Sequence, residues 1–424
     1  METQQPLYAQ WGTIHKIWFR FVSAYIVIYI FPFPANLLLE SGWGKLGGLF
    51  FPLIDWVGHN VLQMTQAIHA EPNGSGDTSY NYVQLFIFLV LAALTAIIWS
   101  LADRKRPNYK KMRYWVRVLV RYYLACYLLI YGFGKFNNGQ FPAPSLSRLI
   151  QPYGRSSPMG LAWTFLGFSK AYGVFMGFSE CIGGVLMLFR RTALFGACIA
   201  TTVVMNIVMI NFCYDVCVKL FSSHLLLFCL FVLCTEGSRF LNLFIFNKAV
   251  PPVDLSPVFQ RPAWKITRIL LKIIFLGAIV GMSLYDSVQQ TGTRSDVKPP
   301  MYGLYDVQVF VQDHDTIPPL PTESARWHKF SVMDPKYAAI RFMDEDDGFV
   351  VFQPDTVHKT VIMYPYKDST TKYQLTYQQE GDVLELYGKF HNYYLYVKMK
   401  RSDEKNLLLI NRGFHWINEM PFSK

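Results

Sequence analysis

The last 190 residues of this 424-residue chain contain no cysteine. All seven cysteines lie from Cys126 to Cys234, which excludes a disulfide framework for the polar sequence after about residue 285. The chain also lacks a Ser/His/Asp order, the ligand spacing of a zinc site and a glycine-rich phosphate loop. Because these common motifs are missing, the fold class and the function have to be inferred from the pattern of apolar segments.

Charged residues are rare within several long apolar segments of the first 285 residues and gather between them. The formal net charge is +11, and basic residues cluster in short loops such as RKRPNYKKMR at 104–113 and the pair Arg190–Arg191. Basic loops between apolar spans set membrane topology, so no nucleic-acid partner is expected. The N-terminus lacks a strongly basic start and a small-residue cleavage site, which indicates an uncleaved first span.

Seven apolar segments are predicted to cross a membrane as helices. With the N-terminus inside, they place the basic loops inside and everything after Asp286 outside. Residues 47–64 are short and bounded by helix breakers, which favours an interfacial or re-entrant helix, whereas an eighth span there would invert the C-terminus. The predicted spans lie within residues 17–39, 83–101, 115–136, 159–191, 192–212, 220–234 and 264–285.

From about Met301 the hydrophobic period changes to two. Eight or nine short alternating segments, separated by turn signals such as Asp-Asp-Gly and Glu-Gly-Asp, are typical of antiparallel strands. Their regular spacing predicts a barrel or a sandwich. The expected architecture is an α-helical membrane bundle over residues 1–285, a linker over 286–300 and an all-β antiparallel domain over 301–424.

One carboxylate lies in the middle of a predicted span. Glu180 has ten residues of helix on either side before the next charged residue, which places it near the centre of a hydrocarbon core about 30 Å thick. Gly173, Gly177 and Gly184 share its helix face, so the acid should face a neighbouring helix and not lipid. An ionisable group at this depth indicates a functional site, and the alternative is a residue that only pins two helices together.

Two basic residues lie on one face of the preceding span. Arg121 and Lys135 are fourteen residues apart, so their side chains project within about 40° of each other. A buried arginine needs a carboxylate, and Glu180 is the only acid deep in a predicted span, so an Arg121–Glu180 pair is expected. The alternative is that Arg121 and Lys135 snorkel to opposite interfaces. Glu180, Arg121 and Lys135 are the candidate catalytic residues.

A polar stripe follows the next span, where Cys198, Thr202, Asn206 and Cys213 lie within about 80° of one another. Such residues often hydrogen-bond between membrane helices. The alternative is that Cys198, Thr202 and Asn206 line a head-group or quinone pocket beside Glu180. A redox pair of Cys213 and Cys217 is disfavoured, because residues four apart on a helix form a strained disulfide.

Two features of the β domain remain. The acidic residues 344–347 lack the ligand spacing of an EF-hand loop, which favours a solvated turn over a metal site. The terminal sequence NRGFHWINEMPF either plugs one end of the β domain or docks on the membrane domain.

The order of the singled-out residues resembles the DoxX family. That family has an arginine opening a span, the lysine of a Gly-x-x-Lys fourteen residues later, a glutamate near the middle of the next span, a glycine-rich stretch and a basic turn. Over about residues 114–233, the matching positions are Arg121, Gly132, Lys135, Glu180, Gly183, Gly184 and Arg190. The whole layout is similar to long DoxX-like proteins of the Bacteroidota. This resemblance implies a multi-pass protein of the bacterial inner membrane with a periplasmic β domain.

Some DoxX-family proteins are subunits of quinone-linked oxidoreductases such as thiosulfate:quinone oxidoreductase, and others are tied to oxidative-stress complexes or act as membrane chaperones. The resemblance implies a bundle that binds a quinone or membrane lipid and supports envelope redox chemistry. Glu180→Gln should then abolish activity in a folded protein. The alternative is a non-enzymatic scaffold or chaperone that presents the β domain to an envelope protein partner. The domain order is also similar to the vitamin K-dependent carboxylase-like family, which gives a membrane carboxylase as a further alternative.

Overall fold

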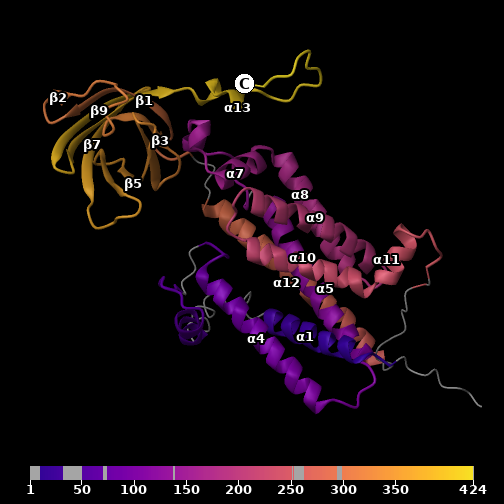
Figure 1. Cartoon of the computed structure of the whole chain (residues 1–424). Helices are drawn as coiled ribbons and strands as arrows, with labels where there is room; N and C mark the ends of the chain where they lie inside the picture. Colours follow the sequence, from indigo (N-terminus) through magenta and orange to yellow (C-terminus); the bar gives the residue numbers. More distant parts are fainter. Residues whose placement is uncertain are drawn as a thin grey trace, which may run out of the picture. The chain divides into compact units, whose positions relative to one another are not determined.

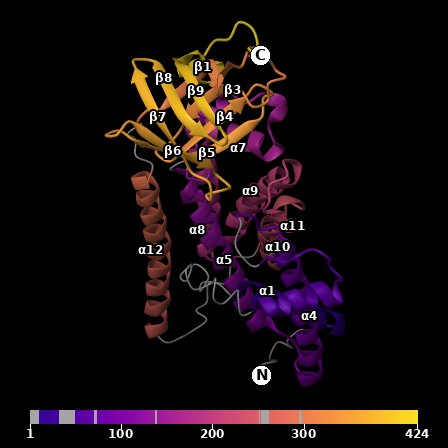
Figure 2. The same cartoon turned by 90° about the vertical axis from the view of Figure 1, so that its left-hand side faces the viewer.

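The computed structural model describes residues 10–31, 50–69, 74–136, 139–250, 252, 262–293 and 298–423. Contacts divide the chain into two compact units. The helical unit comprises residues 1–141 and 169–287, and the barrel unit comprises residues 142–168 and 288–424 (Figures 1 and 2). The end of the predicted first span, after residue 31, lies outside the described residues.

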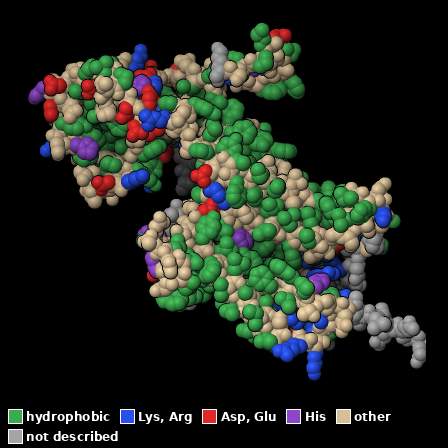
Figure 3. Space-filling view, viewed as in Figure 1, with side chains coloured by type: hydrophobic (Ala, Val, Ile, Leu, Met, Phe, Trp, Pro, Cys, Tyr) green, Lys and Arg blue, Asp and Glu red, His purple; other side chains and the backbone are tan. Residues whose placement is uncertain are grey.

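Apolar helices make up the helical unit, and hydrophobic side chains cover much of its outer surface (Figure 3). Five of the described helices, α1, α4, α5, α8 and α9, are long and apolar enough to cross a membrane, and α10 with α11 forms a sixth span if this pair, bent by 79°, is counted as one. α12 carries a further, shorter apolar stretch, Ile269–Tyr285. Such a set of helices is compatible with a multi-pass membrane protein. The helices are α1 (Thr13–Ile30), α4 (Ser79–Ala102), α5 (Lys110–Phe136), α8 (Lys170–Leu188), α9 (Ala193–Cys213), α10 (Lys219–Thr235), α11 (Gly237–Phe244) and α12 (Pro262–Thr293).

The helices differ from the predicted spans at three places. The predicted helix over 159–191 is two helices, α7 (Pro158–Phe168) and α8, because the Ser169 side chain accepts a hydrogen bond from the backbone N–H of Tyr172 and starts a new helix. α12 continues into the predicted linker as far as Thr293, since residues 286–290 contain no glycine or proline. The described part of the 47–64 piece is a short helix that ends in the π-helix η1 (Val57–Val61).

The β domain is a closed up-and-down barrel. Each strand from β3 to β9 pairs antiparallel with the next, and β1 pairs with both β3 and β9, which closes the sheet. The two-residue β2 (Asp315–Thr316) only extends a hairpin from β1. Eight strands therefore form the barrel, which confirms the predicted antiparallel β domain and selects the barrel over the sandwich. They are β1 (Gly303–Gln312), β3 (Trp327–Val332), β4 (Tyr337–Phe342), β5 (Asp347–Asp355), β6 (Thr360–Pro365), β7 (Tyr373–Glu380), β8 (Val383–Phe390) and β9 (Tyr393–Ser402).

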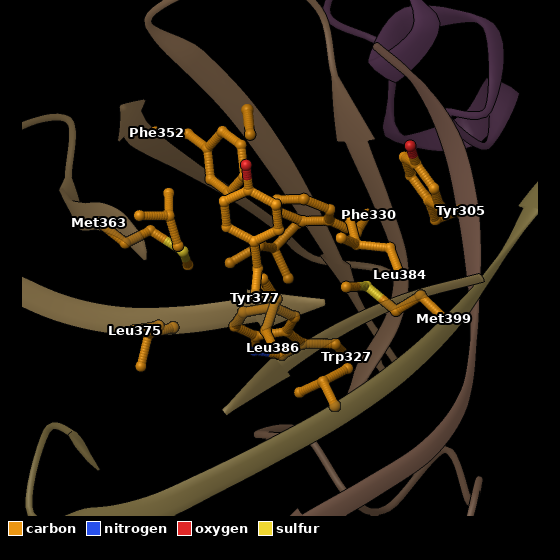
Figure 4. Close-up of a cluster of buried hydrophobic side chains, with 14 of the residues drawn as sticks. Tyr305, Trp327, Phe330, Phe352, Met363, Leu375, Tyr377, Leu384, Leu386 and Met399 are labelled. Carbon is orange, nitrogen blue, oxygen red and sulfur yellow. The ribbon is translucent and has the colours of Figure 1, made fainter. Parts of the chain in front are cut away.

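Alternate side chains of the strands fill the barrel interior (Figure 4). Trp327 is 1% exposed and stacks on Phe330 with the ring centroids 5.7 Å apart. The interior is thus a packed hydrophobic core, as expected for a barrel of this size. The terminal segment does not plug the barrel, because none of its side chains joins this core and Trp416 is 90% exposed.

Charged contacts close the barrel and hold residues 142–168 against it. Asp306 of β1 accepts hydrogen bonds from Lys329 of β3 and Ser402 of β9. Burial raises the pKa of Asp306, but these hydrogen bonds outweigh it and lower the pKa, so the carboxylate stays charged at neutral pH.

Residues 142–168 contact the barrel through Arg155, which donates to the backbone oxygen of Asp344 at 3.0 Å, within the acidic turn. The predicted domain boundaries had placed the segment that carries Arg155 with the helices.

Candidate functional site

Glu180 forms an ion pair with Lys135 inside the helical unit. The Nζ atom of Lys135 lies 2.9 Å from each carboxylate oxygen of Glu180, and the two side chains are 5% and 2% exposed respectively. On α8, the glycines Gly173, Gly177 and Gly184 are buried on the same face as Glu180. The prediction that this acid faces protein is confirmed.

Lys135 has further partners that complete its environment. Its Nζ atom donates to Oε1 of Gln140 at 2.7 Å and lies 5.8 Å from the ring centroid of Tyr131 and 5.6 Å from that of Phe141. A buried ion pair is tolerated only when its remaining hydrogen-bonding groups are satisfied, and cation–π contacts add to this. The lysine is therefore held in the interior by a carboxylate, an amide and two rings.

Glycine contacts bring α5 and α8 together close to this ion pair. A Cβ atom on Gly177 would lie 2.6 Å from the backbone oxygen of Gly132, and one on Gly132 would lie 2.8 Å from the backbone oxygen of Gly177. Neither position has room for a side chain. The two helices thus meet backbone to backbone, which is the packing that small residues permit between membrane helices.

Arg121 does not pair with Glu180, contrary to the expectation from the sequence. Its Nε donates to the backbone oxygen of Met187 at 2.7 Å, while Lys272 of α12 donates to the backbone oxygen of Leu188 at 2.8 Å. These oxygens belong to the last turn of α8, where backbone carbonyl groups have no hydrogen-bond donor within the helix. Because α5 and α8 run antiparallel, Arg121 meets the end of α8, and its observed role is to cap that helix.

A pocket of about 340 Å³ adjoins the ion pair through Tyr131. The Tyr131 ring lines the pocket, and the Tyr131 backbone oxygen lies 3.5 Å from Nζ of Lys135. Helices α1, α4, α5 and α10 supply the walls. Among the described residues, the side chain of Gln84 in this pocket has no hydrogen-bond partner. The lining residues also include Tyr29, Asn81, Leu85, Phe88, Tyr127 and Phe221.

The uncharacterized protein YwoB of Bacillus subtilis (strain 168) is 33% identical to this chain over 154 residues, which make up 94% of YwoB. The chain belongs to the YwoB family. The alignment covers 36% of the chain, so the YwoB relationship describes only part of it. No family model and no solved structure matches.

The polar stripe on α9 of this YwoB-family chain does not lie beside Glu180. Thr202 and Asn206 are exposed, Cys198 is half-buried, and the Thr202 hydroxyl donates to the backbone oxygen of Cys198 at 3.1 Å. A hydroxyl that already forms a hydrogen bond within its own helix does not require a hydrogen-bond partner on a neighbouring helix. The buried face of α9 is marked by Gly196 and Ala200, and these small residues were the sequence signal that could have identified it.

A histidine lies behind one wall of the pocket. Tyr29 stacks on His224 with the ring centroids 4.2 Å apart. Nδ1 of His224 lies 2.7 Å from the backbone oxygen of Leu220, and Nε2 lies 2.5 Å from the Tyr25 hydroxyl. Since a carbonyl only accepts, Nδ1 carries a proton and donates it to Leu220, while Nε2 shares a hydrogen bond with the Tyr25 hydroxyl. The imidazole ring therefore contacts both tyrosines and holds them in place.

None of the seven cysteines forms a disulfide in this structure. The cysteines are free thiols, and α9 ends at Cys213, so Cys217 lies in the following turn and not on the same helix. Within the described parts of the chain, no three His, Cys, Asp or Glu side chains are placed to hold a metal ion.

Proposed function

We propose that the helical unit of this YwoB-family protein binds a quinone and supports redox chemistry at the cell envelope. The buried Lys135–Glu180 ion pair, connected through Tyr131 to an aromatic pocket, is the observation that carries the proposal. Ionisable groups within apolar helices mark functional sites. Aromatic walls with a few polar groups are typical of small-molecule sites. The DoxX-like order of Arg121, Lys135 and Glu180 points to the same function.

The pocket suits the chemistry of a quinone head group, which is a flat ring with two carbonyl oxygens. Tyr29, Phe88 and Tyr127 offer flat walls, and the amide of Gln84 can donate a hydrogen bond to a carbonyl oxygen. Reduction of a quinone to a quinol takes up two electrons and two protons. Glu180 with Lys135 supplies a protonatable pair one residue away from the pocket, and a redox partner protein supplies the electrons.

The charge distribution supports an orientation in a bacterial inner membrane. The exposed basic residues at 104–113 lie where α4 ends and α5 begins, and Glu236 at the end of α10 pairs with Arg117 of α5 and with Arg239. By the positive-inside rule this end is cytoplasmic. The pocket, at the start of α4 and the end of α5, then opens towards the periplasmic side, where we place the barrel.

A second candidate function is a non-enzymatic scaffold or chaperone that presents the barrel to an envelope protein. The filled interior of the barrel favours this role for the barrel unit, because it leaves only the outer surface for binding. Both functions are compatible in one protein, since they use different units.

Filling the pocket tests the quinone proposal. Leu85→Trp places a large ring in the pocket, whereas Leu89→Trp, one turn further along α4, places the same ring at a position that is 40% exposed. We expect saturable binding of a radiolabelled short-chain quinone to the wild type in nanodiscs, and affinity about tenfold lower for Leu85→Trp, equivalent to about 1.4 kcal/mol. Leu89→Trp should bind like the wild type. Absence of saturable binding, or equal behaviour of the two variants, would contradict the proposal.

A further inference from the structure

We infer that residues 412–422 at the C-terminal end form a membrane-binding loop that inserts its apolar side chains into the interfacial region of the bilayer. The tail leaves the barrel after β9 and ends in a loop (Figure 1). We call this segment the terminal loop. The inference does not depend on the proposed quinone function, because the terminal loop belongs to the other unit.

Polar groups close the terminal loop from within. The guanidinium of Arg412 lies 4.2 Å from the ring centroid of Phe422 and donates to Oδ1 of Asn418 at 2.6 Å. The side chain of Asn418 donates to the backbone oxygen of His415 at 3.3 Å, and Nδ1 of His415 lies 2.8 Å from the backbone oxygen of Gly413. The loop thus uses its own polar groups to hold its shape, so that its polar side chains do not need to face a partner.

Large apolar side chains cover the outside of the terminal loop. Phe414, Trp416, Ile417 and Met420 are 79%, 90%, 77% and 80% exposed. The rings of Phe414 and Trp416 pack edge to face with centroids 5.0 Å apart, which holds them as one apolar tip. Soluble surfaces rarely expose such a cluster without a partner. Trp and Phe are also the residues that bind at the boundary between head groups and acyl chains.

The chain path brings this tip within reach of a membrane surface. Ser402 at the end of β9 pairs with Leu304 at the start of β1, and Lys298 lies 3.1 Å from Glu404, so the chain enters and leaves the barrel at the same end. The ten residue steps from the end of α12 at Thr293 to Gly303 span at most about 36 Å. The terminal loop is thus tethered through a short connection to a bilayer crossed by the apolar stretch of α12.

Tethering favours lipid over a separate protein as the occupant. A loop held near a bilayer by its own chain meets lipid at a high effective concentration, so weak insertion of a few side chains is sufficient. The loop carries one basic and one acidic residue, Arg412 and Glu419, and therefore offers no strong charge for recognising a charged protein surface.

Site-specific photo-crosslinking in the full-length protein tests this inference. The photoreactive residue p-benzoylphenylalanine replaces Trp416 in one variant and, as a matched control, replaces Tyr394 in another. Tyr394 is also exposed, at 54%, but lies at the start of β9, at the opposite end of that strand. In phosphatidylethanolamine–phosphatidylglycerol nanodiscs, mass spectrometry should find several-fold more lipid adducts at position 416 than at 394. Equal lipid labelling at both positions, or adducts at 416 that lie mainly on protein, would overturn the inference.

Discussion

Loss of either charge in the Lys135–Glu180 pair is expected to lower the free energy of unfolding of the helical unit by about 3–5 kcal/mol. Glu180→Gln leaves the Lys135 ammonium buried without a carboxylate, and Lys135→Met leaves the Glu180 carboxylate buried without a cation. Denaturation of the purified protein in mild detergent, followed by circular dichroism, measures the loss. The sequence alone predicts that Glu180→Gln leaves the fold intact. Because Lys135 pairs with Glu180, we now expect this substitution to destabilise the fold.

Two further variants distinguish the effect of breaking the buried Lys135–Glu180 pair from the effect of removing any charge. The double variant Lys135→Met with Glu180→Leu removes both charges and fills a similar volume, so its stability should return close to that of the wild type. Asp215→Asn breaks the exposed pair with Lys219, whose atoms lie 2.7 Å apart, and should cost at most about 1 kcal/mol. Full stability in both single variants would show that the buried pair is not formed.

Two glycines near the end of α5 and in α8 should respond to alanine in opposite directions. In Gly177→Ala the new methyl group meets the backbone oxygen of Gly132 at 2.6 Å, so the helices have to separate, at a cost of about 1–3 kcal/mol. In Gly134→Ala the methyl group meets no atom within 4 Å, and the higher helix propensity of alanine should add up to about 1 kcal/mol of stability. The same denaturation assay compares the two variants. Shifts of equal sign and size would contradict the close contact of α5 and α8.

The burial of Glu180 could be predicted, but its partner could not. The glycine spacing around Glu180 identifies the buried face from sequence alone, because periodicity is a local property of a helix. How far α5 is shifted along α8 depends on backbone contacts such as that of Gly132 with Gly177 and on the connection between the helices. This shift along the helix axis places Lys135, and not Arg121, beside Glu180. Tyr131 lies one turn before Lys135 and could have been inferred, whereas Gln140 comes from a loop without any regular pattern.

In the barrel, too, the individual strands could be predicted from local sequence, whereas the closure of the sheet could not. Alternation of apolar residues predicts each strand, as in β9, where Leu395, Val397 and Met399 point inward. Closure requires β1 to meet β9, and this register is set by packing between residues almost a hundred positions apart. Residues 142–168 lack the alternating pattern, so their association with the barrel through Arg155 could not be read from the sequence.

The most direct test of the central claim is mass spectrometry of organic extracts from gently purified full-length protein. The wild type is compared with the double variant Lys135→Met and Glu180→Leu, which is expected to keep the fold but lacks both charges. A stoichiometric quinone that accompanies the wild type and is lost from the double variant is the predicted result. Phospholipid without quinone in both extracts, or an equal amount of quinone in both, would contradict a quinone site built around this ion pair.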